Sequence, residues 1–182
     1  PIAKAESNGE ITVPARKFVE ICKSLPDGCD IHFELHGEKA IVKSGRSRYT
    51  LATLPATDFP SVQRDDSAFS VTVNQGDFAH LLSRTGFSMA QQDVRYYLNG
   101  MLWELSDRIF KSVATDGHRL AISHIDLADP VEGEKQQFII PRKGVVELSR
   151  LLADEAASIT VEFGPNHIRA TTNGMVFVSK LV

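Results

Sequence analysis

The chain contains two similar segments. Residues 13–25, VPARKFVEICKSL, recur at 140–152 as IPRKGVVELSRLL, so that Pro14 and Pro141 lie 127 positions apart. A strand-like run follows each copy, IHFEL at 31–35 and ITVEF at 159–163, and both runs contain a glutamate. A repeat that spans a helix and the strands after it indicates one supersecondary unit used at least twice.

Each copy predicts an amphipathic helix that opens on a proline, which suits the first turn because the missing N–H has no partner there. Apolar residues follow the i, i+3, i+4, i+7 spacing of a buried stripe. The opposite face of each helix carries a cationic pair two turns apart, Arg16 with Lys23 and Lys143 with Arg150. A third helix is expected at 76–89, with Arg84 on its outer face. A merely solvated face is the alternative, and the recurrence of the pair argues against it.

Composition indicates an ordinary globular protein, with 42% hydrophobic and 24% charged residues in 182. The net charge of −3 neither predicts nor excludes nucleic-acid binding, because local charged patches matter more than the net charge. We expect a cytoplasmic protein, because the sequence has no long apolar run and no secretory signal. Cys22 and Cys29 do not stand with other metal-ligating residues at the spacing of a metal site, so neither a metal site nor a cofactor is expected.

The order of predicted elements is strand, helix and three strands, used repeatedly. It indicates an α+β fold with antiparallel sheets and helices on one side. We expect one unit at 1–60, a polar linker at 61–67 and a second unit at 68–182. The expected strands are 30–35, 40–44, 48–54, 68–73, 96–105, 109–115 and 119–125, with a loop at 126–136.

Two further motifs carry a family resemblance, QDVRYYLNGM at 92–101 and ATDGHRLA at 114–121. Together with VPARKF at 13–18, SGRSR at 44–48 and IPRKG at 140–144, they closely resemble the bacterial DNA polymerase III beta subunits, the DNA sliding clamps. The resemblance extends from about residue 11 to residue 182, with the motifs in the family's order.

The resemblance implies a non-catalytic processivity factor with the DNA-clamp fold. In that family two subunits of three similar domains close into a ring around duplex DNA. Residues 1–60 would be the second half of the first domain, and 68–182 the second domain, truncated at its C-terminal end. Sheets would form the outer wall and helices would line the hole. The DNA-facing candidates are Arg16, Lys23, Arg84, Gln92, Lys143 and Arg150.

The resemblance also implies a groove for short linear peptides of DNA polymerase subunits, the clamp loader, and mismatch-repair and translesion proteins. Its candidate residues are Arg95, Tyr97, Leu98, Thr115, Gly117, His118, Arg119 and Leu120. Two other interpretations of this segment remain open. Asp116 and His118 could form the acid–base couple of a small enzyme, or residues 115–120 could be a structural turn.

Residues 44–51 read as a charged edge strand, of the kind that blocks aggregation. The resemblance instead implies a homodimer interface there, with candidates Lys17, Arg46, Arg48, Tyr49 and Leu51. A rival for the whole chain is a protein-interaction module of the same fold that never encircles DNA. For a clamp we expect a cytoplasmic, nucleoid-associated protein.

Overall fold

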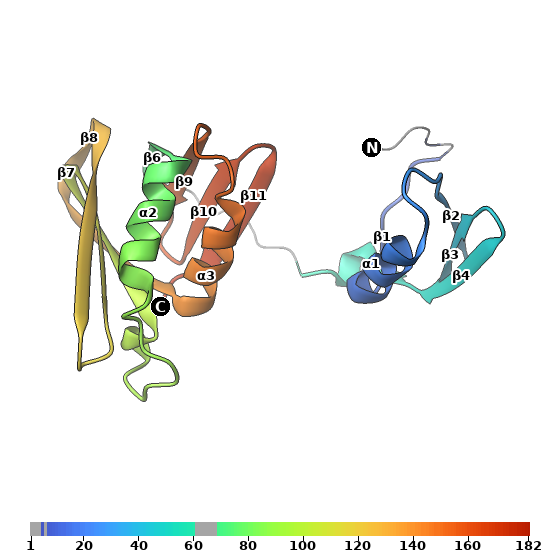
Figure 1. The fold of residues 1–182 in the computed structure, drawn as a ribbon, viewed down its shortest axis with the longest axis horizontal. Helices are drawn as coiled ribbons and strands as arrows, with labels where there is room; N and C mark the ends of the chain where they lie inside the picture. Colours follow the sequence, from blue (N-terminus) through green and yellow to red (C-terminus); the bar gives the residue numbers. More distant parts are fainter. Residues whose placement is uncertain (1–4, 6, 61–68) are drawn as a thin grey trace. The chain divides into compact units, whose positions relative to one another are not determined.

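The computed structural model describes residues 5, 7–60 and 69–182, in two compact units, Pro1–Val62 and Gln63–Val182 (Figure 1). The expected linker at 61–67 lies outside the described residues. Each unit has its own apolar core.

In the first unit one helix, α1 (Ala15–Ser24), covers a three-stranded antiparallel sheet in the order β2-β3-β4. The strands are β2 (His32–His36), β3 (Lys39–Ser44) and β4 (Ser47–Ala52), joined by two-residue turns that begin with glycines at positive φ. A short pair, β1 (Ile11–Thr12) with β5 (Leu54–Pro55), and the 3-10 helix η1 (Ala56–Asp58) complete the unit.

The core of this unit is small because it lies under a single helix. Ala40, Val42 and Leu51 are buried, and Phe18 and Ile21 of α1 pack against them only partly buried. No residue of α1 is fully buried. The apolar stripe predicted from the spacing therefore faces the sheet, but the sheet alone does not cover it.

The second unit contains a four-stranded antiparallel sheet in the order β11-β10-β9-β6. Its strands are β6 (Phe69–Asn74), β9 (Ser158–Phe163), β10 (His167–Thr172) and β11 (Met175–Lys180). The helices α2 (Gln75–Gly86) and α3 (Arg142–Leu151) lie side by side (Figure 1). Asn74 caps α2 by accepting hydrogen bonds from the backbone N–H groups of Gly76 and Asp77.

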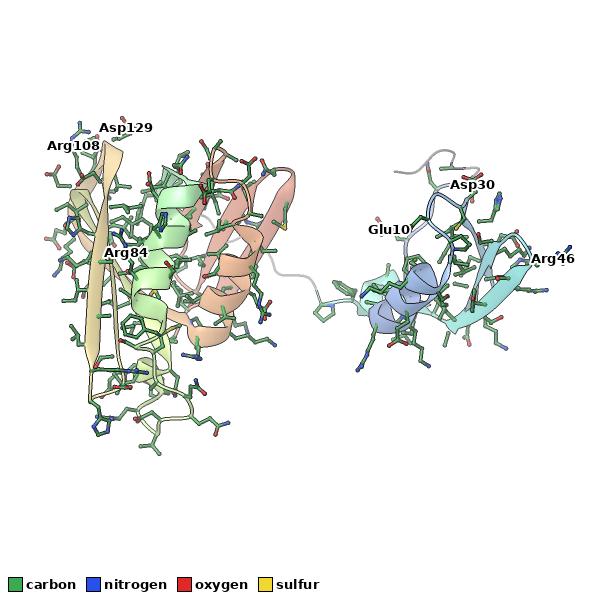
Figure 2. All side chains as sticks on the ribbon, in the orientation of Figure 1. Glu10, Asp30, Arg46, Arg84, Arg108 and Asp129 are labelled. Carbon is green, nitrogen blue, oxygen red and sulfur yellow. The ribbon has the colours of Figure 1, made fainter. Side chains whose placement is uncertain are left out.

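A long antiparallel hairpin of β7 (Gly100–Thr115) and β8 (Leu120–Pro141) also packs against both helices. Its register shifts twice between Leu105 and Ile109, and Asp107 between them has φ 49°. Arg108 and Asp129, both labelled in Figure 2, mark this bend, and paired segments of β7 and β8 continue on either side of it. The sequence-based break between 105 and 109 therefore coincides with a bulged bend within one strand.

Two expectations for this region are wrong. The loop expected at 126–136 is part of β8, and it lies opposite 105–109 of β7 as the wider side of the bulges. Residues 96–98, expected in a strand, form the 3-10 helix η2 (Tyr96–Leu98). The turn-forming residues in 126–136 led to the prediction of a loop. A bulged strand can contain such residues, although a regular strand ladder excludes them.

Helix ends differ from expectation by one to three residues. The helix expected at 76–89 ends at Gly86, and the backbone continues in tighter turns through Ser88 and Met89. Pro14 and Pro141 occupy the N-cap positions, one residue before each repeated helix begins. The core of this unit joins the helices to both sheets through an aromatic cluster of Phe78, Trp103, Phe110 and Phe163.

Candidate functional site

The cationic face of α1 points to solvent. Arg16 and Lys23 are exposed, and Arg16 Nε lies 3.4 Å from the Glu20 carboxylate in an exposed ion pair. Such an exposed pair contributes little to stability. The Arg16 guanidinium therefore remains available to an external anion.

The helices α2 and α3 repeat this arrangement in the second unit. Both bury apolar side chains against the hairpin and leave Arg84, Lys143 and Arg150 exposed. Arg150 Nη1 is 2.9 Å from Glu147 one turn earlier, which neutralises part of its charge. Gln92 lies in the loop after α2, exposed, with φ 58°. The three cations thus share the helix layer of one unit.

The segment Thr115–Leu120 is a turn built around the Asp116 carboxylate. Asp116 Oδ1 accepts the backbone N–H groups of His118 and Arg119 at 3.0 Å each, and Oδ2 accepts Arg119 Nε at 3.1 Å. These backbone donors and the Arg119 charge lower the pKa of Asp116. Residues 115–120 therefore form a hydrogen-bonded turn. An acid–base couple is not supported, because Asp116 bonds the backbone of His118 and its pKa moves away from neutrality.

Arg119 extends from this turn to the end of α2. Its Nη2 donates to the Phe87 carbonyl at 2.8 Å, and the guanidinium lies 5.7 Å from the centroid of the exposed Phe87 ring. Thr115 closes the turn by donating to the Arg119 carbonyl at 2.7 Å and accepting the Gly117 N–H. Arg119 is therefore held on both sides.

A second arginine reaches the same turn from the loop before η2. Asp93 accepts Arg95 Nε at 3.0 Å and Nη2 at 2.9 Å, and this fork lowers the pKa of Asp93 to about 2. Asn99 holds Asp93 through two hydrogen bonds between the Asn99 side chain and the Asp93 backbone. Arg95 then lies over Gly117, where a Cβ would stand 3.0 Å from Arg95 Nη2.

The apolar candidates lie around these two arginines. Leu120 begins β8 and is 60% exposed, and Tyr97 is exposed with its ring against Tyr96. Leu98 is half-buried, and its backbone carbonyl accepts the Ala90 N–H at 3.0 Å. The structure thus joins Arg95, Thr115, Gly117, His118 and Arg119 by direct or turn contacts and presents Leu120 beside them.

The expected subunit surface is an open groove of about 440 Å³ in the first unit, between α1 and the edge strand β4. Ser24 and Tyr49 approach across it, with their hydroxyls 3.3 Å apart. Arg46 lies in the turn between β3 and β4 (Figure 2), and Arg48 is exposed. The lining residues are Lys17, Glu20, Ile21, Ser24, Tyr49, Thr50 and Leu51.

Two family models match the chain. Residues 72–182 match the central domain of the DNA polymerase III beta subunit, and residues 1–63 match its N-terminal domain. The chain belongs to the DNA polymerase III beta subunit family. The first model alone covers more than half of the chain.

Known beta sliding clamps resemble the chain closely. It is 50% identical over 178 residues to that of Pseudomonas aeruginosa and 47% identical over 174 residues to that of Escherichia coli K12. These alignments cover 98% and 96% of the chain, but only 48% and 47% of the relatives. The chain therefore spans about half the length of the beta subunits it matches.

Crystal structures of beta subunits share the fold. The P. aeruginosa beta subunit superposes with a TM-score of 0.95 at 49% identity, over 100% of this chain and 50% of that one. The Caulobacter crescentus clamp gives 0.88 at 31% identity, over 98% and 50%. A P. aeruginosa clamp bound to griselimycin gives 0.94 at 49% identity, over 100% and 49%.

In this beta-subunit chain, sequence reasoning missed the residues that hold the candidates in place, chiefly Phe87, Asp93 and Asn99. The signal for Asp93 was its spacing of two from Arg95 inside the QDVRYYLNGM motif. Within the described residues, no group of three His, Cys, Asp or Glu side chains is placed to bind a metal ion. No helix of the described part of the chain is long and apolar enough to span a membrane.

Proposed function

We propose that this chain forms part of a ring-shaped sliding clamp, a non-catalytic processivity factor that encircles duplex DNA. The observation that carries the proposal is the repeated cationic helix face, exposed on α1, α2 and α3 while the opposite faces pack on sheets. Lysines and arginines on helix faces contact phosphates without reading bases. A ring that slides needs such sequence-independent contacts.

The proposed DNA contacts are Arg16, Lys23, Arg84, Gln92, Lys143 and Arg150. Ion pairs with Glu20 and Glu147 weaken two of these charges in the free protein. Displacing a weak exposed ion pair requires little free energy. These residues therefore fit transient contacts better than a fixed docking site.

The proposed partner groove uses Leu120 as the apolar wall and the two held arginines as the rim. A short linear motif gains most of its affinity from one or two buried apolar anchors. Because Asp93 and Asp116 already orient Arg95 and Arg119, little side-chain entropy is lost when a peptide binds. The partners are DNA polymerase subunits, the clamp loader, and mismatch-repair and translesion proteins.

We also place the subunit interface of a homodimer on the α1/β4 groove, and the protein in the cytoplasm, on the nucleoid. Residues 1–60 belong to the first clamp domain and 68–182 to the second in this proposal. Tyr49, Lys17, Arg46 and Arg48 are accessible enough to meet a partner directly. Leu51 is 4% exposed, so it would support the interface from inside the core.

Retention on circular against linear DNA tests the proposal. A full-length beta subunit carrying this sequence is loaded onto nicked circular DNA, and half of the sample is then linearised. We expect the protein to stay on circles in moderate salt and to slide off linear ends within the same period. Equal retention on both forms would instead favour the interaction module that never encircles DNA.

A further inference from the structure

The first turn of α3 is bonded to the loop that carries part of the proposed partner groove. We call residues 87–99, between α2 and β7, the groove loop. Among the proposed groove residues it carries Arg95, Tyr97 and Leu98. The Arg142 N–H donates to the Asn99 carbonyl at 2.9 Å. A Cβ on Gly100 would stand 2.6 Å from the Ile140 carbonyl oxygen, so the two strands approach this closely only because position 100 is a glycine. The backbone thus fixes one end of the groove loop to the start of α3.

The Arg142 side chain reaches the other end of the groove loop. Its Nη1 donates to the carbonyl of the buried Met89 at 3.1 Å. Arg142 is half-buried, and no carboxylate among the described residues forms an ion pair with it. A hydrogen bond from a charged donor is stronger than one between neutral groups. One residue therefore holds both ends of the loop, Asn99 through its backbone and Met89 through its side chain.

Hydrogen bonds within the groove loop connect its two ends to the groove residues. The Ala90 N–H donates to the Leu98 carbonyl at 3.0 Å, which joins the two sides of the loop. The Asn99 side chain binds the Asp93 backbone at 2.8 and 2.9 Å, and the Asp93 carboxylate holds Arg95. The positions of Leu98 and Arg95 thus depend on where the ends of the loop are held.

The repeat shows that a helix of this kind does not itself require the arginine. The residue of α1 that matches Arg142 is Ala15, 127 positions earlier, whereas the next position is cationic in both copies, Arg16 and Lys143. A cation in the first turn also interacts unfavourably with the helix dipole, which favours negative charge there. The arginine therefore has a reason outside α3, and its contact with Met89 provides one.

We propose that Arg142 is a positioning residue of the partner groove, and that it fixes the groove loop so that Arg95 and Leu98 stay in place for a bound peptide. This role rests on the proposed peptide groove and adds a residue of α3 to it. A loop that is held at both ends has less conformational entropy to lose when a ligand binds. Release of the Met89 carbonyl should therefore weaken the peptide complex, although Arg142 acts through the loop.

Peptide titration of a full-length beta subunit carrying this sequence tests the role of Arg142. The probe is a fluorescein-labelled hexapeptide with one leucine and one phenylalanine anchor, titrated without DNA and followed by anisotropy. Arg142→Met keeps a long side chain but removes the donors, and it should weaken binding by roughly three- to tenfold. Arg142→Lys restores a charged donor and should bind within about twofold of wild type. Lys180→Met removes an exposed cation from β11 and should leave the affinity unchanged.

Hydrogen exchange on the 182-residue chain distinguishes a local role of Arg142 from a general one. Arg142→Met should speed exchange of the Ala90 and Asp93 N–H groups, which are bonded within the groove loop. The N–H of Val161, in the central strand β9, should keep its wild-type rate. Equally faster exchange at all three positions would show a general loss of stability and would overturn a specific positioning role.

The outcomes of the titration separate this role from the groove itself. Wild-type affinity in Arg142→Met, or an equal loss in Lys180→Met, would overturn the role of Arg142 and leave the groove standing. If Arg142→Met keeps the peptide affinity but lowers the log–log salt slope of DNA retention by about 0.9, Arg142 contacts a phosphate instead. Absence of peptide binding by the wild type would overturn the groove and this role together.

Discussion

Arg95 lies directly over Gly117, although the two residues come from different loops. A Cβ at position 117 would stand 3.0 Å from Arg95 Nη2, and Gly117 has φ 86°. The absence of a side chain thus lets an arginine held by Asp93 close over the turn that precedes Leu120. Two motifs that are separate in the sequence become one surface through this contact.

Gly117→Ala should therefore cost more than backbone strain alone. Gly133 is a matched control, because it has φ 91° and nothing within 4 Å of its virtual Cβ. Gly133→Ala should lower the free energy of unfolding by about 1–2 kcal/mol. Gly117→Ala should lower it by more and shift the Arg95 Nε–H resonance in NMR spectra. Equal losses, with that resonance unmoved, would mean that Arg95 does not rest on Gly117.

Leu51→Ala should destabilise the first unit itself. The side chain is 4% exposed and packs with Ala40 and Val42. Truncation of a buried leucine lowers the free energy of unfolding by about 2–5 kcal/mol. Leu54→Ala is the control, since Leu54 is 63% exposed in the same unit. Urea unfolding followed by Phe and Tyr signals of the unit measures both variants, and similar midpoints would show that Leu51 is not a core residue.

The repeat made the helices and most strands predictable because 3.6-residue and two-residue periods survive in each copy. The helix 141–152 and the strands around Glu34 and Glu162 follow from the sequence within one or two residues. The β7/β8 hairpin does not, because its bulges place polar and turn-forming residues inside a strand. Bulge positions depend on pairing with the opposite strand, which a local pattern does not encode.

For the candidate site, the sequence motifs identified some of the contacting residues but not how they contact one another. Arg119 and Gly117 stand in the ATDGHRLA motif, whereas Phe87 lies 32 positions from Arg119 and bonds it through a backbone carbonyl. Any residue can provide a carbonyl, so no side-chain signal marks position 87. The burial of Leu51 could not be predicted either. Alternation along a strand shows which residues share a face, but not which of the two faces is covered.

Glu104 should make the second unit's stability depend on acid pH. Lys111 Nζ at 2.7 Å, then Gln137 and Lys135, lower the pKa of Glu104 from 4.5 to about 2. A depressed carboxyl pKa stabilises the fold above pH 4.5, and this contribution disappears as the pH falls towards 2. Glu104→Gln should therefore lower the free energy of unfolding by about 1 kcal/mol at pH 7. Between about pH 5 and 2 the free energy of unfolding of the variant should fall less steeply than that of the wild type. If the free energy of unfolding of the wild type and of the variant depends on pH in the same way, Glu104 does not have this role.

The α3 cations should contribute to retention on DNA irrespective of sequence. In a full-length beta subunit carrying this chain, Lys143→Gln with Arg150→Gln should lower the log–log salt slope by about 1.8, roughly 0.9 for each lost phosphate contact. Arg108→Gln with Lys180→Gln removes the same charge from exposed sheet positions and should leave the slope unchanged. If both double variants change the slope equally, the helix face has no special part in DNA contact.

Leu120→Ala should separate partner binding from folding. Leu120 and Ile122 lie on alternate positions of β8, share a face and are 60% and 59% exposed. Truncating either should change the free energy of unfolding by less than about 0.5 kcal/mol, because neither side chain is buried.

Only Leu120 adjoins the turn that carries Gly117 and Arg119. Its loss should weaken a clamp-binding peptide by about 1–3 kcal/mol in the full-length protein, whereas Ile122→Ala should bind almost as wild type. Calorimetric titration of the three proteins decides the matter. If Leu120→Ala keeps wild-type affinity, residues 115–120 are a structural turn alone; if Ile122→Ala loses as much, the peptide lies along the strand face and not in the proposed groove.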